Sequence, residues 1–198
     1  MKIRTSKIIS SDKKLAELIL LISMQSEGDE KFGATKLNKL LFHCDFSAYL
    51  NFNVPITGQE YFALREGPAP RRLVPVSRGL QRRGHLIIRK QDYFGRIQNR
   101  PIALRPPNVS IFKPREINLV NYTLNRFRDF NATEISRHSH LFIGWRVARE
   151  KETIPYSTAL IDLREPTIDE RDRGLKLEAL AKKALRRHAR PKDAHGHP

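Results

Sequence analysis

Apolar residues recur every three or four positions near the start of the chain, and this period predicts a helix over residues 11–25. Ser11 is placed to cap the helix start, and Asp12 follows where the helix dipole favours an acid. The apolar stripe consists of Leu15, Leu18, Ile19 and Ile22. One face of this helix is therefore expected to lie in the core.

A second helix of about 16 residues is predicted after the loop "SEGDEKFG", with Thr35 as its cap. Its stripe consists of Leu37, Leu40, Leu41, Cys44 and Ala48, and the apolar face is widened by Phe42, Phe46 and Tyr49. Because aromatic residues extend the stripe, this helix is expected to be central and buried on most sides.

The middle of the chain alternates between short apolar segments and turn residues. "YFALR" predicts a short strand, and "EGPAP" predicts a break after it. A helix is expected between Pro70 and Arg83, with Gly84 as its stop. Because Pro75 lies within that span, either the first turn does not form or the helix starts near Pro75. The segments "HLIIRK" and "RIQNRPIALRP" predict two strands joined as a hairpin.

The last third of the chain is predicted to be helical. A helix is expected to begin near Pro114, and Asn131 with Glu134 has the spacing of a capping box. The segment "TIDERDRGLKLEALAKKALRRHAR" predicts a terminal helix interrupted at Gly174, and the last eight residues are expected to be disordered.

These elements predict an α+β fold that is mainly α-helical, with one small antiparallel hairpin or sheet. Hydrophobic residues make up 39% of the 198 positions, which is enough for a core. We expect a single compact helical domain over residues 1–165, followed by a basic C-terminal helix and tail over residues 166–198.

The net charge of +16 is concentrated in two regions. Residues 65–105 hold eleven basic and two acidic side chains, and residues 176–198 hold seven basic and two acidic ones. A solvated surface is one interpretation of such runs. The other is an electropositive face that binds nucleic acid or an acidic protein.

A single cysteine, Cys44, excludes an internal disulfide and is typical of a reducing cytoplasm. The N-terminus has no apolar segment of the kind a secretory signal needs. The longest apolar run, residues 18–22, is far shorter than the roughly 20 residues of a membrane span. We therefore expect a cytoplasmic protein that does not enter the membrane.

The sequence carries none of the phosphate-loop, dinucleotide, zinc-protease or serine-hydrolase motifs. His43 and Cys44 are adjacent on a predicted helix, where side chains diverge by about 100° and make a poor catalytic pair. His138 and His140 would need further ligands to hold a metal. We expect no catalytic residue, metal or cofactor.

The basic helix and the hairpin after it resemble a winged helix in their order. Phosphate contacts could come from the helix and from the hairpin, and the candidate DNA-binding residues are Arg78, Arg82, Arg83, Arg89, Lys90 and Arg96. Few side chains there suit base recognition, so this interpretation favours non-specific binding.

Two stretches together resemble the opening of the Panacea antitoxin domain, the SocA-like group found beside toxin genes and in phage-associated regions. These stretches are "KLNKLLFHCDFSAYL" and "PITGQEYFALREGPAPRRL". Later in the chain, "RHSHLFIGW" places Ser139, His140 and Trp145 where the family often shows Ser-x-x-His followed by Trp. The spacing before His140 is shorter here than in the family pattern. The resemblance spans roughly residues 10–163. The positions that carry it are Leu37, Lys39, Leu40, Asp45, Gly58, Tyr61, Gly67, Pro68, His140 and Trp145.

The resemblance implies a non-enzymatic antitoxin that neutralises a cognate protein toxin by direct contact; the SocA type also delivers its toxin to a protease. The motif residues are expected to be mainly structural, with Tyr61 half-buried. This chain departs from the family in its strongly basic helix, and toxin contact is expected there. Because arginine is enriched in binding hot spots, the residues predicted to contact the toxin are Arg71, Arg72, Arg78, Arg82 and Arg83.

Three functions follow in order of preference. The first is an antitoxin that binds a toxin, and the second is a DNA-binding regulator, of its own operon for example, that uses the basic 65–105 segment. The two are compatible. A hydrolase ranks last, because no acid, base and nucleophile have suitable spacing.

Overall fold

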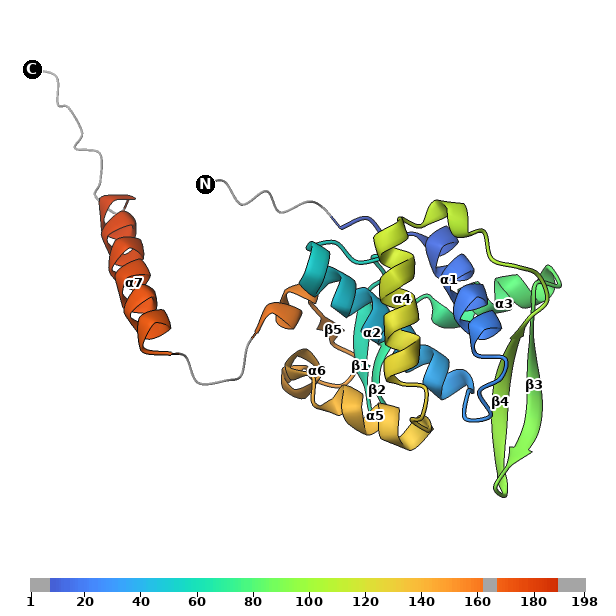
Figure 1. Ribbon diagram of the computed structural model, residues 1–198. Coiled ribbons are helices and arrows are strands. Elements are labelled where there is room, and N and C mark those ends of the chain that lie inside the picture. Colours follow the sequence, from blue (N-terminus) through green and yellow to red (C-terminus); the bar gives the residue numbers. More distant parts are fainter. Residues whose placement is uncertain (1–7, 162–166, 189–198) are drawn as a thin grey trace, which may run out of the picture. The chain divides into compact units, whose positions relative to one another are not determined.

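The computed structural model of the protein describes residues 8–161 and 167–188 (Figure 1). The chain forms two compact units, Met1–Ile161 and Asp162–Pro198. Among the described residues, the second unit contains α7 (Ile168–His188). The first unit contains α1 (Asp12–Gln25), α2 (Ala34–Phe52), β1 (Tyr61–Leu64), β2 (Gly67–Pro70), α3 (Leu73–Arg82), β3 (Leu86–Tyr93), β4 (Arg96–Ala103), α4 (Pro114–Arg126), α5 (Ala132–His140), α6 (Ile143–Val147) and β5 (Thr153–Ile154), with short 3₁₀ helices at Val109–Ile111 and Tyr156–Leu160. The predicted α+β, mainly helical class is confirmed, and the domain boundary near residue 165 stays a prediction.

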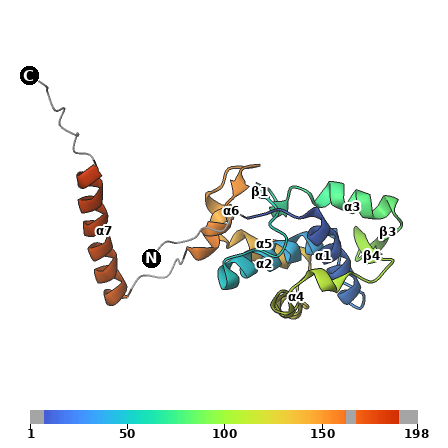
Figure 2. The same ribbon diagram turned by 90° about the horizontal axis from the view of Figure 1, so that it is seen from above.

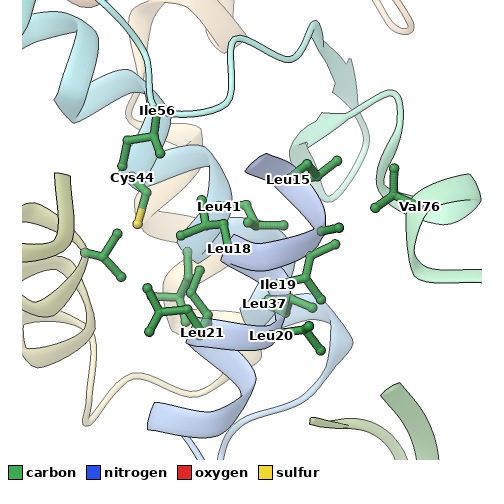
Figure 3. Close-up of a cluster of buried hydrophobic side chains, with 14 of the residues drawn as sticks. Leu15, Leu18, Ile19, Leu20, Leu21, Leu37, Leu41, Cys44, Ile56 and Val76 are labelled. Atoms are coloured by element: carbon green, nitrogen blue, oxygen red, sulfur yellow. The ribbon is translucent and has the colours of Figure 1, made fainter. Parts of the chain in front are cut away.

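Helix α1 lies at the centre of the core. Its predicted cap is confirmed, since the Ser11 hydroxyl accepts a hydrogen bond from the Lys14 N–H at 3.1 Å. The predicted stripe is fully buried, and Leu20 and Leu21 are buried as well. Figure 3 shows these side chains meeting those of α2, the loop after it and α3. Helix α1 is thus enclosed on more sides than a single stripe requires.

Helix α2 begins earlier than its predicted cap implies. Gly33 is the N-cap, without a side-chain hydrogen bond, so the prediction of Thr35 as the cap is wrong. A Cβ on Gly33 would lie 2.8 Å from Cγ of Gln98 on β4. The chain therefore needs glycine at this point because the hairpin approaches it closely.

The segment "EGPAP" forms part of a sheet, so the predicted break between a strand and the next helix is wrong. Gly67 begins β2, which pairs antiparallel with β1 and places Leu64 opposite Gly67. Strand β5 pairs with the other edge of β1, and the order is β2-β1-β5. Strand β2 tolerates Pro68 and Pro70 because an edge strand needs fewer ladder hydrogen bonds.

The β3–β4 hairpin forms as predicted, and α3 forms within the predicted range but starts at Leu73, because Pro70 belongs to β2. Pro75 lies in the first turn of α3, and Gly84 adopts the left-handed conformation after its end, with φ of 67°. Strands β3 and β4 pair along their whole length, and Tyr93 faces Arg96 across the loop of Phe94 and Gly95. Figures 1 and 2 both place α3 beside the base of the hairpin.

The later helices also follow the sequence at their starts. Pro114 opens α4, and the predicted capping box of α5 is confirmed by hydrogen bonds between Asn131 and Glu134 in both directions. Helix α7 continues through Gly174, so the predicted interruption is wrong. A glycine inside a helix costs only about 1 kcal/mol, which the neighbouring helix-forming residues overcome. The predicted disordered tail lies outside the described residues.

Among the described residues, no helix is both long enough and apolar enough to cross a membrane.

Candidate functional site

An exposed set of cations lies on α3 and the adjoining hairpin. We call it the cationic surface, and it consists of Arg78, Arg82, Arg83, Arg89, Lys90 and Arg96. None of the six has an ion pair or a side-chain hydrogen bond with another described residue. These charges are therefore free to meet a partner, and they include every residue of the predicted DNA-binding set.

Two of the five arginines predicted to contact a toxin are already engaged within the domain. Arg71 forms an ion pair with Glu60 at 3.2 Å and lies over the ring of Phe62. Arg72 binds the Asp12 carboxylate at 2.6 Å, and this contact lowers the pKa of Asp12. The structure thus separates Arg71 and Arg72 from the other three, which belong to the cationic surface.

Two further basic residues of the 65–105 segment hold the hairpin in place. Arg100 donates to backbone oxygens of the segment that follows α1, at 3.1 Å for Ser26 and 2.7 Å for Asp29. Arg105 pairs with Glu17 at 2.5 Å, and this hydrogen bond lowers the pKa of Glu17. An acid within the apolar run of α1 is the sequence signal that could have indicated such a buried partner.

Asp45 is the centre of a buried polar cluster. Its carboxylate is fully buried and accepts hydrogen bonds from the Thr57 N–H at 2.7 Å, from the Thr57 hydroxyl and from the Tyr61 hydroxyl at 2.9 Å. Burial raises the pKa of Asp45, and these donors oppose that rise. Tyr61 is fully buried, so the prediction that it is half-buried is wrong. The cluster joins α2 to the turn at Gly58, whose φ is 66°, and to β1.

Lys39 is the centre of a second buried cluster. Its side chain is 1% exposed, and its ammonium donates to the Pro68 carbonyl at 3.2 Å. Burial lowers the pKa of Lys39 to about 8, with the charge of Glu66 acting in the opposite direction. Gly67 has φ of 102°, and a Cβ there would lie 2.8 Å from the Lys39 nitrogen and 2.5 Å from the Ser139 hydroxyl. Glycine is therefore required where β2 crosses the lysine.

His43, His140 and Cys44 pack within the first unit. His140 stacks on Trp145 at 4.0 Å, and the Trp145 indole donates to the Leu64 carbonyl at 2.9 Å. His43 stacks on Phe127, and burial lowers the pKa of His43 to about 3. Cys44 is fully buried, which raises the pKa of its thiol. Among the residues that the structure describes, no three His, Cys, Asp or Glu gather as metal ligands would.

The motif residues thus lie inside the domain, whereas the free charge lies on its surface. Leu37 and Leu40 are buried in the core, and Lys39 and Asp45 each hold a strand or turn against α2. The residues that carry the family resemblance and the exposed cations are therefore separate sets.

The family is shown by the match to its model. The chain belongs to the SocA-like antitoxin, Panacea domain family, whose model matches residues 37–146. This range lies within the predicted span of roughly 10–163 and includes most of α2, the sheet strands β1 and β2, α3, the hairpin, α4 and α5. Neither the curated proteins nor the solved structures include a match to the chain.

Proposed function

We propose that this protein is the antitoxin of a toxin–antitoxin system and neutralises a protein toxin by direct contact. Membership of the SocA-like family supports the antitoxin role. The cationic surface supports the mode of action, because six exposed cations without partners among the described residues favour binding to an acidic surface. The protein acts in the reducing cytoplasm, where the free Cys44 stays reduced.

The toxin-binding site is centred on Arg78, Arg82 and Arg83. Arginine is enriched among the residues that dominate binding free energies, because its planar group can pair with carboxylates in two places at once. Arg71 and Arg72 contribute less in this proposal, since Glu60 and Asp12 already neutralise part of their charge.

The test is binding of the protein encoded by the neighbouring gene. We expect the two proteins to co-elute, and the triple variant R78E/R82E/R83E to bind at least about a hundredfold more weakly, since three reversed charges should remove at least about 3 kcal/mol. Growth of cells that express the toxin should fail with this variant and recover with the wild type.

A matched control reverses three exposed arginines elsewhere on the domain, as R128E/R137E/R146E. The two triple variants have the same net charge and differ only in where the charges are reversed. If the toxin binds at Arg78, Arg82 and Arg83, the control variant should therefore keep most of the affinity for the toxin. Equal reductions of affinity in both variants, or no complex with the wild type, would count against the proposal. The half-life of the toxin with and without the antitoxin separates occlusion of the toxin from delivery to a protease.

Duplex DNA is a second candidate partner of the same surface. The observation that favours it is that the free cations are not confined to α3, since Arg89, Lys90 and Arg96 lie on the hairpin that follows it. A helix beside a two-stranded hairpin is a geometry that can follow a DNA backbone. Because the surface offers mainly arginine, we propose phosphate contacts with little sequence preference.

Salt dependence distinguishes this second candidate. Binding to upstream DNA of its own operon should weaken with salt, and R82E/R83E should abolish it. In single-arginine variants that still bind, the slope of log affinity against log salt should fall by about 0.9 for each phosphate that the protein no longer neutralises. An unchanged DNA affinity in R82E/R83E would exclude this surface as the DNA site.

A further inference from the structure

A groove of about 490 Å³ lies beneath the tip of the β3–β4 hairpin. Hairpin residues between 93 and 99 form one wall, and the starts of α2 and α5 form the other. This volume lies within the range of sites that bind ligands or short peptide segments. Gln98 fixes the position of the hairpin over the groove by donating to the Glu30 carbonyl at 3.2 Å and accepting from Gln91 at 2.7 Å.

The lining of the groove favours a negatively charged occupant. Lys31 and Arg96 line it, and no carboxylate of the described residues does. Arg96 is exposed and has no ion pair with another described residue. The groove also reaches the first turn of α2, whose N-cap Gly33 supplies no side-chain acceptor. The positive end of a 19-residue helix adds to the field of the two cations.

Phe94 at the hairpin tip is unfavourable for the hairpin itself. It adopts φ of 51°, a left-handed conformation that Asn, Asp or Gly would adopt more readily in a two-residue loop. This strain costs about 1 kcal/mol. Burial does not compensate for it, because Phe94 is 88% exposed. Among the aromatic rings of the described residues, that of Phe94 contacts only the ring of its neighbour Tyr93, with 4.9 Å between the ring centroids. Ile97, on the same wall, is 75% exposed. Residues that break a local rule without an internal gain are expected where a protein binds something.

The edge of β4 can pair with an extended chain. Tyr93 and Arg96 flank the two-residue loop, so they exchange hydrogen bonds across the hairpin. The next residue, Ile97, therefore points its N–H and C=O away from β3, and no backbone hydrogen bond joins it to another described segment. An exposed strand edge of this kind accepts an added strand.

We propose that this groove binds an extended acidic peptide segment of a partner protein, with an apolar side chain held by Phe94 and Ile97 and carboxylates facing Arg96 and Lys31. A peptide can form backbone hydrogen bonds with the edge of β4 and also bury the side chains of Phe94 and Ile97, whereas a nucleic acid backbone cannot do both. The proposal goes beyond toxin neutralisation and does not depend on it, because the groove is lined without Arg78, Arg82 or Arg83.

The test is selection of ligands for the full chain from a displayed library of random linear peptides. We expect the selected peptides to be acidic, with apolar residues interspersed, and R96E to lower their affinity by at least about tenfold. The matched control R146E reverses one exposed charge on α6, away from the groove, and should leave peptide affinity within about twofold. No selection, selection of neutral or basic peptides, or equal affinity for R96E would overturn the proposal.

A second variant separates binding from folding. Phe94→Asn suits the left-handed conformation, so its melting temperature should equal or exceed that of the wild type, while its affinity for the selected peptides should fall at least about tenfold. Unchanged peptide affinity in Phe94→Asn would overturn the proposal. So would a single-stranded oligonucleotide that displaces the selected peptides and itself needs Phe94, because the groove would then be a nucleic-acid site.

Discussion

Asp45→Ala should lower the free energy of unfolding by about 3–5 kcal/mol, because it leaves three buried donors without an acceptor. The donors are the N–H and hydroxyl of Thr57 and the hydroxyl of Tyr61, and all belong to fully or almost fully buried residues. Each unsatisfied donor costs about 1–3 kcal/mol. Urea denaturation followed by far-UV circular dichroism measures the change.

The double variant Asp45→Ala with Tyr61→Phe tests whether the destabilisation arises from those donors. Tyr61→Phe alone should cost about 1 kcal/mol, since it removes one hydrogen bond to Asp45. In the Asp45→Ala background the same change removes an unsatisfied hydroxyl and should cost nothing or be stabilising. Strictly additive effects would show that Asp45 stabilises the fold in some other way. Asp45→Asn keeps the size of the side chain and should fall between the wild type and Asp45→Ala.

The helices could be predicted from the sequence because their signals are local. The stripe of α1, the cap at Ser11 and the capping box at Asn131 each depend on residues within a few positions of one another. The role of Gly67 and Pro68 could not be predicted, because the same two residues suit a break before a helix and the start of an edge strand. The choice also depends on Lys39 of α2 and on Ser139, which lie far from Gly67 along the chain but next to it in the fold.

The candidate site could be predicted only in part, because the sequence does not show which charges are neutralised. Arg72 pairs with Asp12 and Arg105 with Glu17, across separations of 60 and 88 residues. Nothing near Arg72 in the sequence distinguishes it from Arg82, which has no such partner among the described residues. The sequence therefore predicts a basic surface, but only the fold shows which arginines of that surface are free to bind a partner.

The two buried lysines of α2 are a second case in which residue type alone does not predict the environment of a charge. Lysine is almost never fully buried, so residue type alone favours the helix surface for Lys36 and Lys39. Both are 1% exposed. Lys36 has two close partners in the Asp29 carboxylate at 2.6 Å and the Arg128 carbonyl at 2.8 Å. Lys39 has the Pro68 carbonyl alone among the hydrogen-bond acceptors of the described residues, and its charge is therefore poorly compensated.

That poor compensation should make stability rise at high pH. The pKa of Lys39 is about 8 in the folded protein and 10.5 as its ordinary value. Between these values the unfolded chain binds more protons at this residue than the folded chain does, so folding gains stability as the pH rises. Below pH 8 the lysine is charged in both states, and its full penalty remains. One pKa unit corresponds to about 1.4 kcal/mol, so the gain between pH 8 and 10.5 is about 3 kcal/mol.

Lys39→Met isolates this contribution, because it keeps the length of the side chain and removes the charge. The contributions of all other ionisable groups are shared by the two proteins and cancel in the difference. We expect the free energy of unfolding of wild type minus that of Lys39→Met to rise by about 3 kcal/mol from pH 8 to 10.5, and to stay constant from about pH 6 to 7. The missing hydrogen bond to Pro68 shifts the whole difference but not its slope. Parallel stability curves across the range would mean that Lys39 keeps an ordinary pKa, and that the cluster at Gly67 compensates its charge fully.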